Sequence, residues 1–229
     1  MILILRGHIR NSFDNNKLYE LIKLIYEKNS DLMIYIHTWS IVQNNLSWRK
    51  LDNIYTEVTE NLIKDYFKDL THLIKKIIID DDKKINLIGR TRGALCNTKA
   101  PLIGWKNYWY GKYNIINYLN DLFENKNEVL INCRFDVLSN SYSYSHDKII
   151  EFIETNKNNI FKKNIFISKN NEPFCGMDNI YLGNIETQYK LISHFHYNLD
   201  LLIRNHHRNR IKNQEFLVFF VNNNLFQNC

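Results

Sequence analysis

The sequence predicts an α/β protein, a single domain built on a mostly parallel, twisted sheet that is flanked by helices. Short apolar runs alternate with longer stretches in which apolar residues recur at helical spacing, and this order is typical of parallel sheets covered on both faces. The chain has 229 residues, of which 45% are hydrophobic, enough for one substantial core. With two prolines and seven glycines, it has no Pro/Gly-rich linker. We therefore expect one domain over residues 1–229.

Each expected element follows from a local pattern. The first strand is the apolar run 2–5, and the first helix covers residues 18–26, where Leu18, Leu21 and Ile25 recur at helical spacing. The other elements are, in chain order, a strand at 32–36, a helix capped by Thr59, a strand at 74–79, a loop over 86–104, a helix at 107–124, a strand at 129–133, a helix near 147–154, strands at 165–168 and 180–182, and a helix from 186 to about 203. The stripe Trp105, Trp109 and Tyr113 has the spacing of a buried helix face.

Polar residues follow the first expected strand. Ligands of parallel sheets bind outside the carboxyl ends of the strands, so the residues after each strand are candidates for a site. Gly7 permits a close approach of the backbone, and the guanidinium groups of Arg6 and Arg10 can fork onto a phosphate pair. With His8, these residues form a candidate nucleotide-binding loop; the alternative is a basic surface loop.

His37 and Trp39 follow the second expected strand. A histidine there can bond a phosphate or ribose, and a tryptophan can stack on a base or sugar face. The alternatives are a half-buried structural histidine and a core tryptophan.

Arg134 and Asp136 end the apolar run 129–133. When a diphosphate leaves, the developing negative charge must be stabilised by a divalent ion on carboxylates or by fixed cations. Arg134 is a candidate fixed cation, whereas Asp136 is a candidate metal ligand or acceptor for a sugar hydroxyl. The alternative is an Arg–Asp pair that caps the next segment.

Two further carboxylates lie in the second half of the chain. Asp178 follows Gly176 in a loop and is a candidate base or acceptor-binding group, although turn aspartates are common. Glu215 begins an apolar run, where it charges a helix start or faces the site.

Composition restricts the class of partner and excludes several functions. The net charge of +6 and the pI of about 9.0 favour anionic partners, so a basic nucleic-acid-binding module is the alternative function. The basic residues are scattered, however, and we expect no specific nucleic-acid binding. No P-loop, G-x-G-x-x-G or G-x-S-x-G motif occurs, and no histidine has cysteine or carboxylate partners at zinc-ligand spacing.

Localisation is predicted from the cysteines and the apolar runs. Cys96, Cys133, Cys175 and Cys229 show no C-x-x-C spacing and are expected to be free thiols. No signal-peptide core and no apolar run of about 20 residues is present. We expect a cytoplasmic protein without a membrane span, in the host cytoplasm if the source is viral.

The segments LRGHIR, IYIHTW, INCRFD and GMDNIYLGN, in this order, resemble a family of small sugar-transferring proteins of surface-polysaccharide clusters and large DNA viruses. Those proteins look like glycosyltransferases of the GT-A, Rossmann-like type. The resemblance implies that residues from 1 to about 136 bind the nucleotide sugar and residues from about 137 to 229 the acceptor. Arg134 and Asp136 stand where others carry D-x-D, and Asp178 is implied on the acceptor side.

We therefore expect a glycosyltransferase that moves a sugar from a nucleotide-diphosphate sugar to a glycan or another hydroxyl acceptor. Donor contacts are expected from the first two strand ends, and catalytic roles from Arg134, Asp136 and Asp178. Mn²⁺ or Mg²⁺ on Asp136 is one possibility, and metal-independent transfer with Arg134 as the fixed cation is the other. An inactive relative that only binds remains a further alternative.

Overall fold

The computed structural model describes residues 1–46, 52–95, 100–168, 174–208 and 214–227. Their central sheet has six strands in the order β5-β2-β1-β6-β8-β7. The strands are β1 (Ile2–Arg6), β2 (Met33–Trp39), β5 (Ile74–Asp80), β6 (Val129–Arg134), β7 (Ile165–Phe166) and β8 (Ile180–Asn184). β5, β2, β1 and β6 run parallel, and β8 pairs antiparallel with both β6 and β7. The predicted α/β class with a mostly parallel sheet is confirmed.

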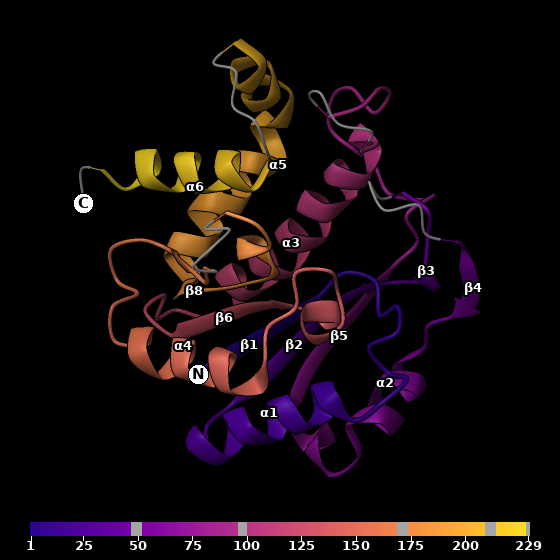
Figure 1. Ribbon diagram of the computed structural model, residues 1–229, viewed down its shortest axis with the longest axis vertical. Helices are drawn as coiled ribbons and strands as arrows, with labels where there is room; N and C mark the ends of the chain where they lie inside the picture. Colours follow the sequence, from indigo (N-terminus) through magenta and orange to yellow (C-terminus); the bar gives the residue numbers. More distant parts are fainter. Residues whose placement is uncertain (47–51, 96–99, 169–173, 209–213, 228–229) are drawn as a thin grey trace.

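Helices cover both faces of this sheet (Figure 1). One face packs against α1 (Lys17–Lys28), α2 (Glu60–Phe67) and α4 (His146–Asn156), and the other against α3 (Leu102–Leu122), α5 (Ile185–Arg208) and α6 (Gln214–Leu225). Short 3-10 turns are η1 (Lys68–Leu73), η2 (Phe135–Leu138) and η3 (Met177–Asn179), and a small second sheet pairs β3 (Ile41–Gln43) with β4 (Ile54–Glu57). Within the described part of the chain, no helix combines the length and apolarity needed to cross a bilayer.

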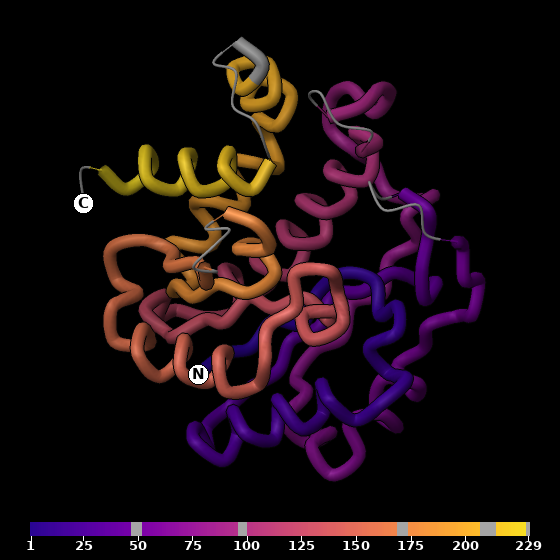
Figure 2. Tube along the Cα trace, viewed as in Figure 1, coloured from indigo at the N-terminus to yellow at the C-terminus, as the bar shows by residue number. Residues whose placement is uncertain are grey.

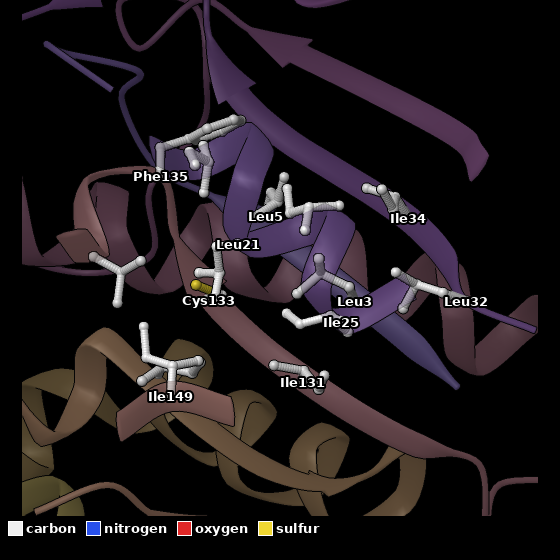
Figure 3. Packing of buried hydrophobic residues seen from close by; sticks show 14 of the residues in the cluster. Leu3, Leu5, Leu21, Ile25, Leu32, Ile34, Ile131, Cys133, Phe135 and Ile149 are labelled. Carbon is white, nitrogen blue, oxygen red and sulfur yellow. The ribbon is translucent and has the colours of Figure 1, made fainter. Parts of the chain in front are cut away.

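The strands contribute side chains to two hydrophobic clusters, because successive side chains of a strand point to opposite faces of the sheet. In β1, Leu3 and Leu5 join the cluster under α1 and α4, and Ile2 and Ile4 join the cluster under α3 and α5. Figure 3 shows the first of these clusters, in which Leu21 and Ile25 of α1 pack near Leu3 and Leu5 of β1. A sheet buried on both faces explains why the strand sequences are almost continuously apolar.

The long helix α3 confirms one sequence prediction and corrects another. Trp105 and Trp109 are buried in the core as predicted, with Trp109 stacked on Phe195 of α5 at 4.0 Å between ring centroids. Tyr113 is partly buried and packs against the same cluster. The helix begins at Leu102, directly after Pro101, and not at residue 107. Its first turns therefore come from a segment that was predicted to be a loop.

Other boundaries also differ from the expectation. β2 continues to Trp39, so His37 and Trp39 lie in the strand and not beyond it. The β3–β4 hairpin was not predicted, because its strands are short and β4 is exposed. The predicted cap is confirmed, since the side chain of Thr59 accepts a hydrogen bond from the backbone of Leu62 at 3.1 Å.

Neither described cysteine takes part in a disulfide, as predicted. Cys133 is buried in β6 and Cys175 is partly buried. Burial raises the pKa of the Cys133 thiol to about 12, so this thiol is unreactive. Cys96 and Cys229 lie outside the described residues.

The path of the chain creates a switch point between β1 and β6. From β1 the chain moves outward to β2 and β5, and it then returns through α3 to β6 on the opposite side of β1 (Figure 2). In open α/β sheets, ligands bind at the carboxyl ends of the strands at such a point. The fold therefore directs attention to the ends of β1 and β6.

Candidate active site

Arg6, His37 and Arg134 stand side by side in register at the carboxyl ends of three neighbouring strands. Arg6 of β1 pairs with His37 of β2 on one side and with Arg134 of β6 on the other. Side chains in register on parallel strands point to the same face of a sheet. The polar ends of β2, β1 and β6 therefore lie next to one another at one edge of the sheet.

The arginine cluster consists of Arg134, Asp136 and Arg10. The guanidinium of Arg134 donates two hydrogen bonds to the carboxylate of Asp136, each 2.7 Å long, and Arg10 donates a third of 2.6 Å. Burial alone would lower the pKa of Arg134, but Asp136 and Asp178 raise it, so this group remains a cation. The Arg–Asp pair considered as a structural alternative is therefore formed, with two guanidinium groups on one carboxylate, but within the described residues the side chain of Arg134 makes no capping hydrogen bond to η2.

Arg6 is buried beside this cluster, with 2% of its surface exposed. Its guanidinium donates to the side chain of Asn132 and to the backbone carbonyl of Asp178, and it lies 4.9 Å from the ring centroid of Tyr108. Asn132 in turn donates to Gln188 of α5 at 3.1 Å. This buried chain of hydrogen bonds holds Arg6 in one orientation.

Asp178 follows a tight turn at Gly176. Gly176 has a φ of 71°, in the left-handed region, and a Cβ there would lie 2.5 Å from that of Tyr142. Tyr108 donates a hydrogen bond of 2.7 Å to the Asp178 carboxylate. Burial would raise the pKa of Asp178, but the positive charges of Lys112 and Arg134 outweigh it, so the pKa lies below its ordinary value. Asp178 is therefore a stable anion and a weak base.

Gly7, His8 and Trp39 lie at the carboxyl ends of β1 and β2, and all three line the pocket described below. Gly7 has a φ of 93°, and its backbone donates to the carbonyl of His37 at 3.1 Å. The imidazole of His8 stacks on Trp39 with ring centroids 5.9 Å apart. Burial, followed by the charges of Arg10 and Arg134, lowers the pKa of His8 to about 3. His8 is thus neutral at physiological pH.

The histidine cluster consists of His37, Asp80 and Asn114. The ring of His37 is fully buried, and its Nε2 lies 3.1 Å from the Asp80 carboxylate, which also accepts a hydrogen bond of 2.8 Å from Asn114. Gly111 of α3 packs on this ring, since a Cβ there would lie 2.6 Å from the imidazole Cε1. His37 is therefore placed as a structural histidine.

A pocket opens over the arginines, with a cavity volume of about 130 Å³. At ~10–15 Å³ per water molecule, it is larger than an ordinary packing void. Most of the predicted site residues line it together: Arg6, Gly7, His8, Arg10, Trp39, Arg134 and Asp178. Asp136 lies behind Arg10 and Arg134, and His37 is not among the lining residues. Three of these lining residues are arginines and one is an aspartate, so their net charge is positive and the pocket suits an anion.

Sequence reasoning missed the contribution of α3. Asn107 and Tyr108 line the pocket from this helix. Lys112 is 1% exposed and lies within 4.8 Å of the ring centroids of Tyr108, Trp109 and Tyr181. Burial lowers the pKa of Lys112 well below its ordinary value, with Asp178 opposing the shift. The sequence does contain a signal for this role, namely a lysine at position 112 within an apolar stripe of the helix. Buried lysines are rare without a partner, so such a position points to a special environment.

Glu215 lies at the start of α6, next to the pocket residue Gln214. Burial raises the pKa of Glu215 to about 7, and the negative charge of Asp178 contributes to the rise. Its charge therefore changes near physiological pH, and it interacts electrostatically with both Asp178 and Arg134.

The donor set does not match that of a divalent ion. Both carboxylate oxygens of Asp136 already accept hydrogen bonds from guanidinium groups. No group of three or more His, Cys, Asp or Glu side chains able to hold a metal occurs among the described residues. Hard cations such as Mg²⁺ require several oxygen ligands. Asp136 as a metal ligand stays a prediction.

Comparison with known proteins identifies no family for this chain. No protein-family model matches the sequence, and no curated protein matches it. Among solved structures, an active-site mutant of LgtC, a glycosyltransferase, aligns with 98% of this chain and 69% of its own, at 9% sequence identity and a TM-score of 0.42. A likeness of this extent assigns neither a family nor an activity.

Proposed function

We propose that this protein transfers a sugar from a nucleoside-diphosphate sugar to a hydroxyl group of a glycan or another acceptor. The observation that supports the proposal is the cationic pocket at the switch point between β1 and β6, lined by Arg6, Arg10 and Arg134. Guanidinium groups match phosphate oxygens in geometry and charge. Ligand binding at this point of a parallel sheet is the expected arrangement.

In the proposed reaction, the bond between the anomeric carbon and the β-phosphate oxygen breaks. Its electron pair leaves with the nucleoside diphosphate, the acceptor oxygen bonds to the anomeric carbon, and the proton of the acceptor hydroxyl passes to the departing diphosphate. Arg134 offsets the charge that develops on the departing diphosphate, because it is held in place before the reaction by Asp136. Arg10 and Arg6 bind the diphosphate in the ground state.

The proposed transfer is independent of metal. Arg134 and Arg10 supply the positive charge that a divalent ion on paired carboxylates would otherwise supply. Asp136 then serves to hold the two guanidinium groups, since its carboxylate accepts hydrogen bonds from both of them. The carboxylate has no role in the chemical step.

Asp178 binds the acceptor hydroxyl and orients it. A carboxylate with a lowered pKa is a poor proton acceptor but a strong hydrogen-bond acceptor. Tyr108 holds it at 2.7 Å. Asp178→Asn is therefore expected to raise the KM for the acceptor more than it lowers kcat.

A thermal-shift screen with UDP-, GDP- and dTDP-sugars, with and without Mn²⁺, tests the proposal, with CMP-sugars, which have one phosphate, as the control. A bound donor raises the melting temperature by mass action, and the same rise is expected without Mn²⁺. Released nucleoside diphosphate then measures transfer to a panel of glycans. Absence of any shift or binding heat at millimolar donor would refute the proposal, and binding without transfer would identify an inactive binding protein.

A further inference from the structure

The pocket has two chemically different ends. One end is cationic, with Arg6, Arg10 and Arg134. The rest of the lining includes an apolar group of residues from α3 and the loops beside it: Leu46, Leu95, Ala100, Pro101 and Trp105. A ligand that fills the whole pocket therefore combines an anionic part with a part that has apolar faces.

Asn107 of α3 is one of the residues that line this pocket, and its carboxamide is buried. The residue is 4% exposed, and both its Oδ1 and Nδ2 are enclosed without a hydrogen-bond partner among the described residues. Buried carboxamides are almost always hydrogen-bonded, and leaving one unpaired costs stability. Because Asn107 belongs to the lining of the pocket, a ligand bound there is the candidate for the missing partners, which the carboxamide reaches when it turns toward the ligand.

The place of Asn107 on α3 follows from two glycines on the same side of the helix. A Cβ at Gly104 would lie 2.3 Å from the carbonyl oxygen of Leu46, and one at Gly111 would meet the ring of His37. Asn107 lies three residues after the first and four before the second, so it shares their side of the helix. It therefore lies between the apolar lining at Leu46 and the aromatic pair of His37 and Trp39, whose ring centroids are 5.2 Å apart.

A nucleobase suits this end of the pocket better than a sugar ring does. Hydroxyl groups surround a sugar ring, and an apolar wall would leave most of them without partners. A base has two apolar faces and carries its donors and acceptors along its edge. The carboxamide of asparagine presents one acceptor and one donor side by side in a plane, and this pair matches the edge of a base.

We propose that Asn107 binds the edge of a nucleobase in the apolar end of the pocket, while the diphosphate lies against the arginines. This inference rests on the proposed function, because it places the base of the same nucleoside-diphosphate ligand. The chemical class is a base whose edge has an adjacent donor and acceptor, and Asn107 is its specificity-determining residue.

Titration calorimetry with UDP, GDP, ADP, CDP and base-free inorganic pyrophosphate tests the assignment. At least one nucleoside diphosphate is expected to bind ten times more tightly than pyrophosphate or better. Asn107→Leu conserves volume and removes the two unpaired atoms. The substitution is expected to weaken binding of the preferred nucleoside diphosphate roughly 10- to 100-fold. Pyrophosphate binding should be unchanged, and the melting temperature of the free protein should rise.

Two further variants sharpen the experiment. Asn107→Asp replaces the donor with a second acceptor, so it is expected to shift preference toward GDP, whose base has two adjacent donors. Asn117→Ala, on the same helix and hydrogen-bonded only to Asp121 in the described structure, is the matched control and is expected to bind as the wild type does.

The outcomes separate this inference from the proposed function. If nucleoside diphosphates bind no more tightly than pyrophosphate, or if Asn107→Leu binds every nucleotide as the wild type does, the base subsite is wrong and the diphosphate site stands. If neither nucleotides nor pyrophosphate bind, the proposed function is wrong and the subsite with it.

Discussion

Two clusters at the same edge of the sheet share their chemistry and differ in their surroundings. In the arginine cluster, the carboxylate of Asp136 accepts hydrogen bonds from Arg10 and Arg134. In the histidine cluster, the carboxylate of Asp80 interacts with His37 and Asn114. Both clusters lie at the ends of parallel strands. The arginines line the pocket, whereas the ring of His37 is fully buried.

Helix α3 causes this difference. At Gly111 the helix packs directly on the imidazole of His37, with no room for a side chain between them. At its first turns, Asn107 and Tyr108 line the pocket. A polar strand end therefore becomes a site only where the covering helix leaves space for a ligand.

The largest effect is expected from Arg134→Ala. If Arg134 offsets charge on the leaving diphosphate, its benefit is greater in the transition state than in the bound donor. Turnover should fall by about 10²- to 10³-fold, the scale for losing one preorganised electrostatic group, with a much smaller change in donor affinity. Stopped sugar-transfer assays and titration calorimetry on the same preparation measure both quantities.

Arg134→Lys is the matched control for that experiment. An ammonium cannot reproduce the two parallel hydrogen bonds to Asp136, so little activity should return. Transfer at the wild-type rate by a normally folded Arg134→Ala protein would show that the arginine cluster is only structural.

His37→Phe should act on stability and not on binding. The substitution conserves ring size but removes the interaction with the Asp80 carboxylate, so the free energy of unfolding should fall by about 1.5–3 kcal/mol. Donor affinity per folded molecule should be unchanged. Urea denaturation and calorimetry check the two parts, with the exposed His72→Phe as the control. A specific loss of donor affinity would place His37 in the site after all.

The smallest effect is a pH dependence from Glu215. Its pKa is raised to about 7, so it becomes negative as the pH rises through neutrality, near Asp178 and Arg134. Affinity for a nucleoside diphosphate should therefore fall roughly two- to tenfold between about pH 6 and 8. Glu215→Gln should remove this fall, and any slope that remains belongs to the phosphate itself.

The carboxyl group of Glu215 also makes the stability of the protein depend on pH. Between its unfolded pKa near 4.5 and its folded value near 7, the folded state binds more protons than the unfolded state, so stability should decline as the pH rises through this window. Urea denaturation of the wild type and Glu215→Gln across this range gives the difference. Identical pH profiles would mean that Glu215 is not buried as described.

Much of the fold could be predicted from the sequence because its causes are local. Apolar runs and helical periodicity indicated the principal strands and most helices, and the side chain of Thr59 caps α2 as its residue type suggests. The polar ends of β1 and β6 were recognised as one edge, because parallel strands all present their carboxyl ends on the same side. Residue type also identified arginines as the groups that favour an anion.

Only the tertiary structure decided which of these residues share a pocket. Arg10 and Asp136 are 126 positions apart, and their contact depends on β1 and β6 being neighbours. Asn107 became a candidate only when α3 was seen to start at Leu102 and Asn107 was seen to line the pocket. Periodicity tells which face of a helix is apolar, but the distance between that face and a sheet edge is set by packing between segments far apart in the chain. That long-range packing separates the open arginine cluster from the closed histidine cluster.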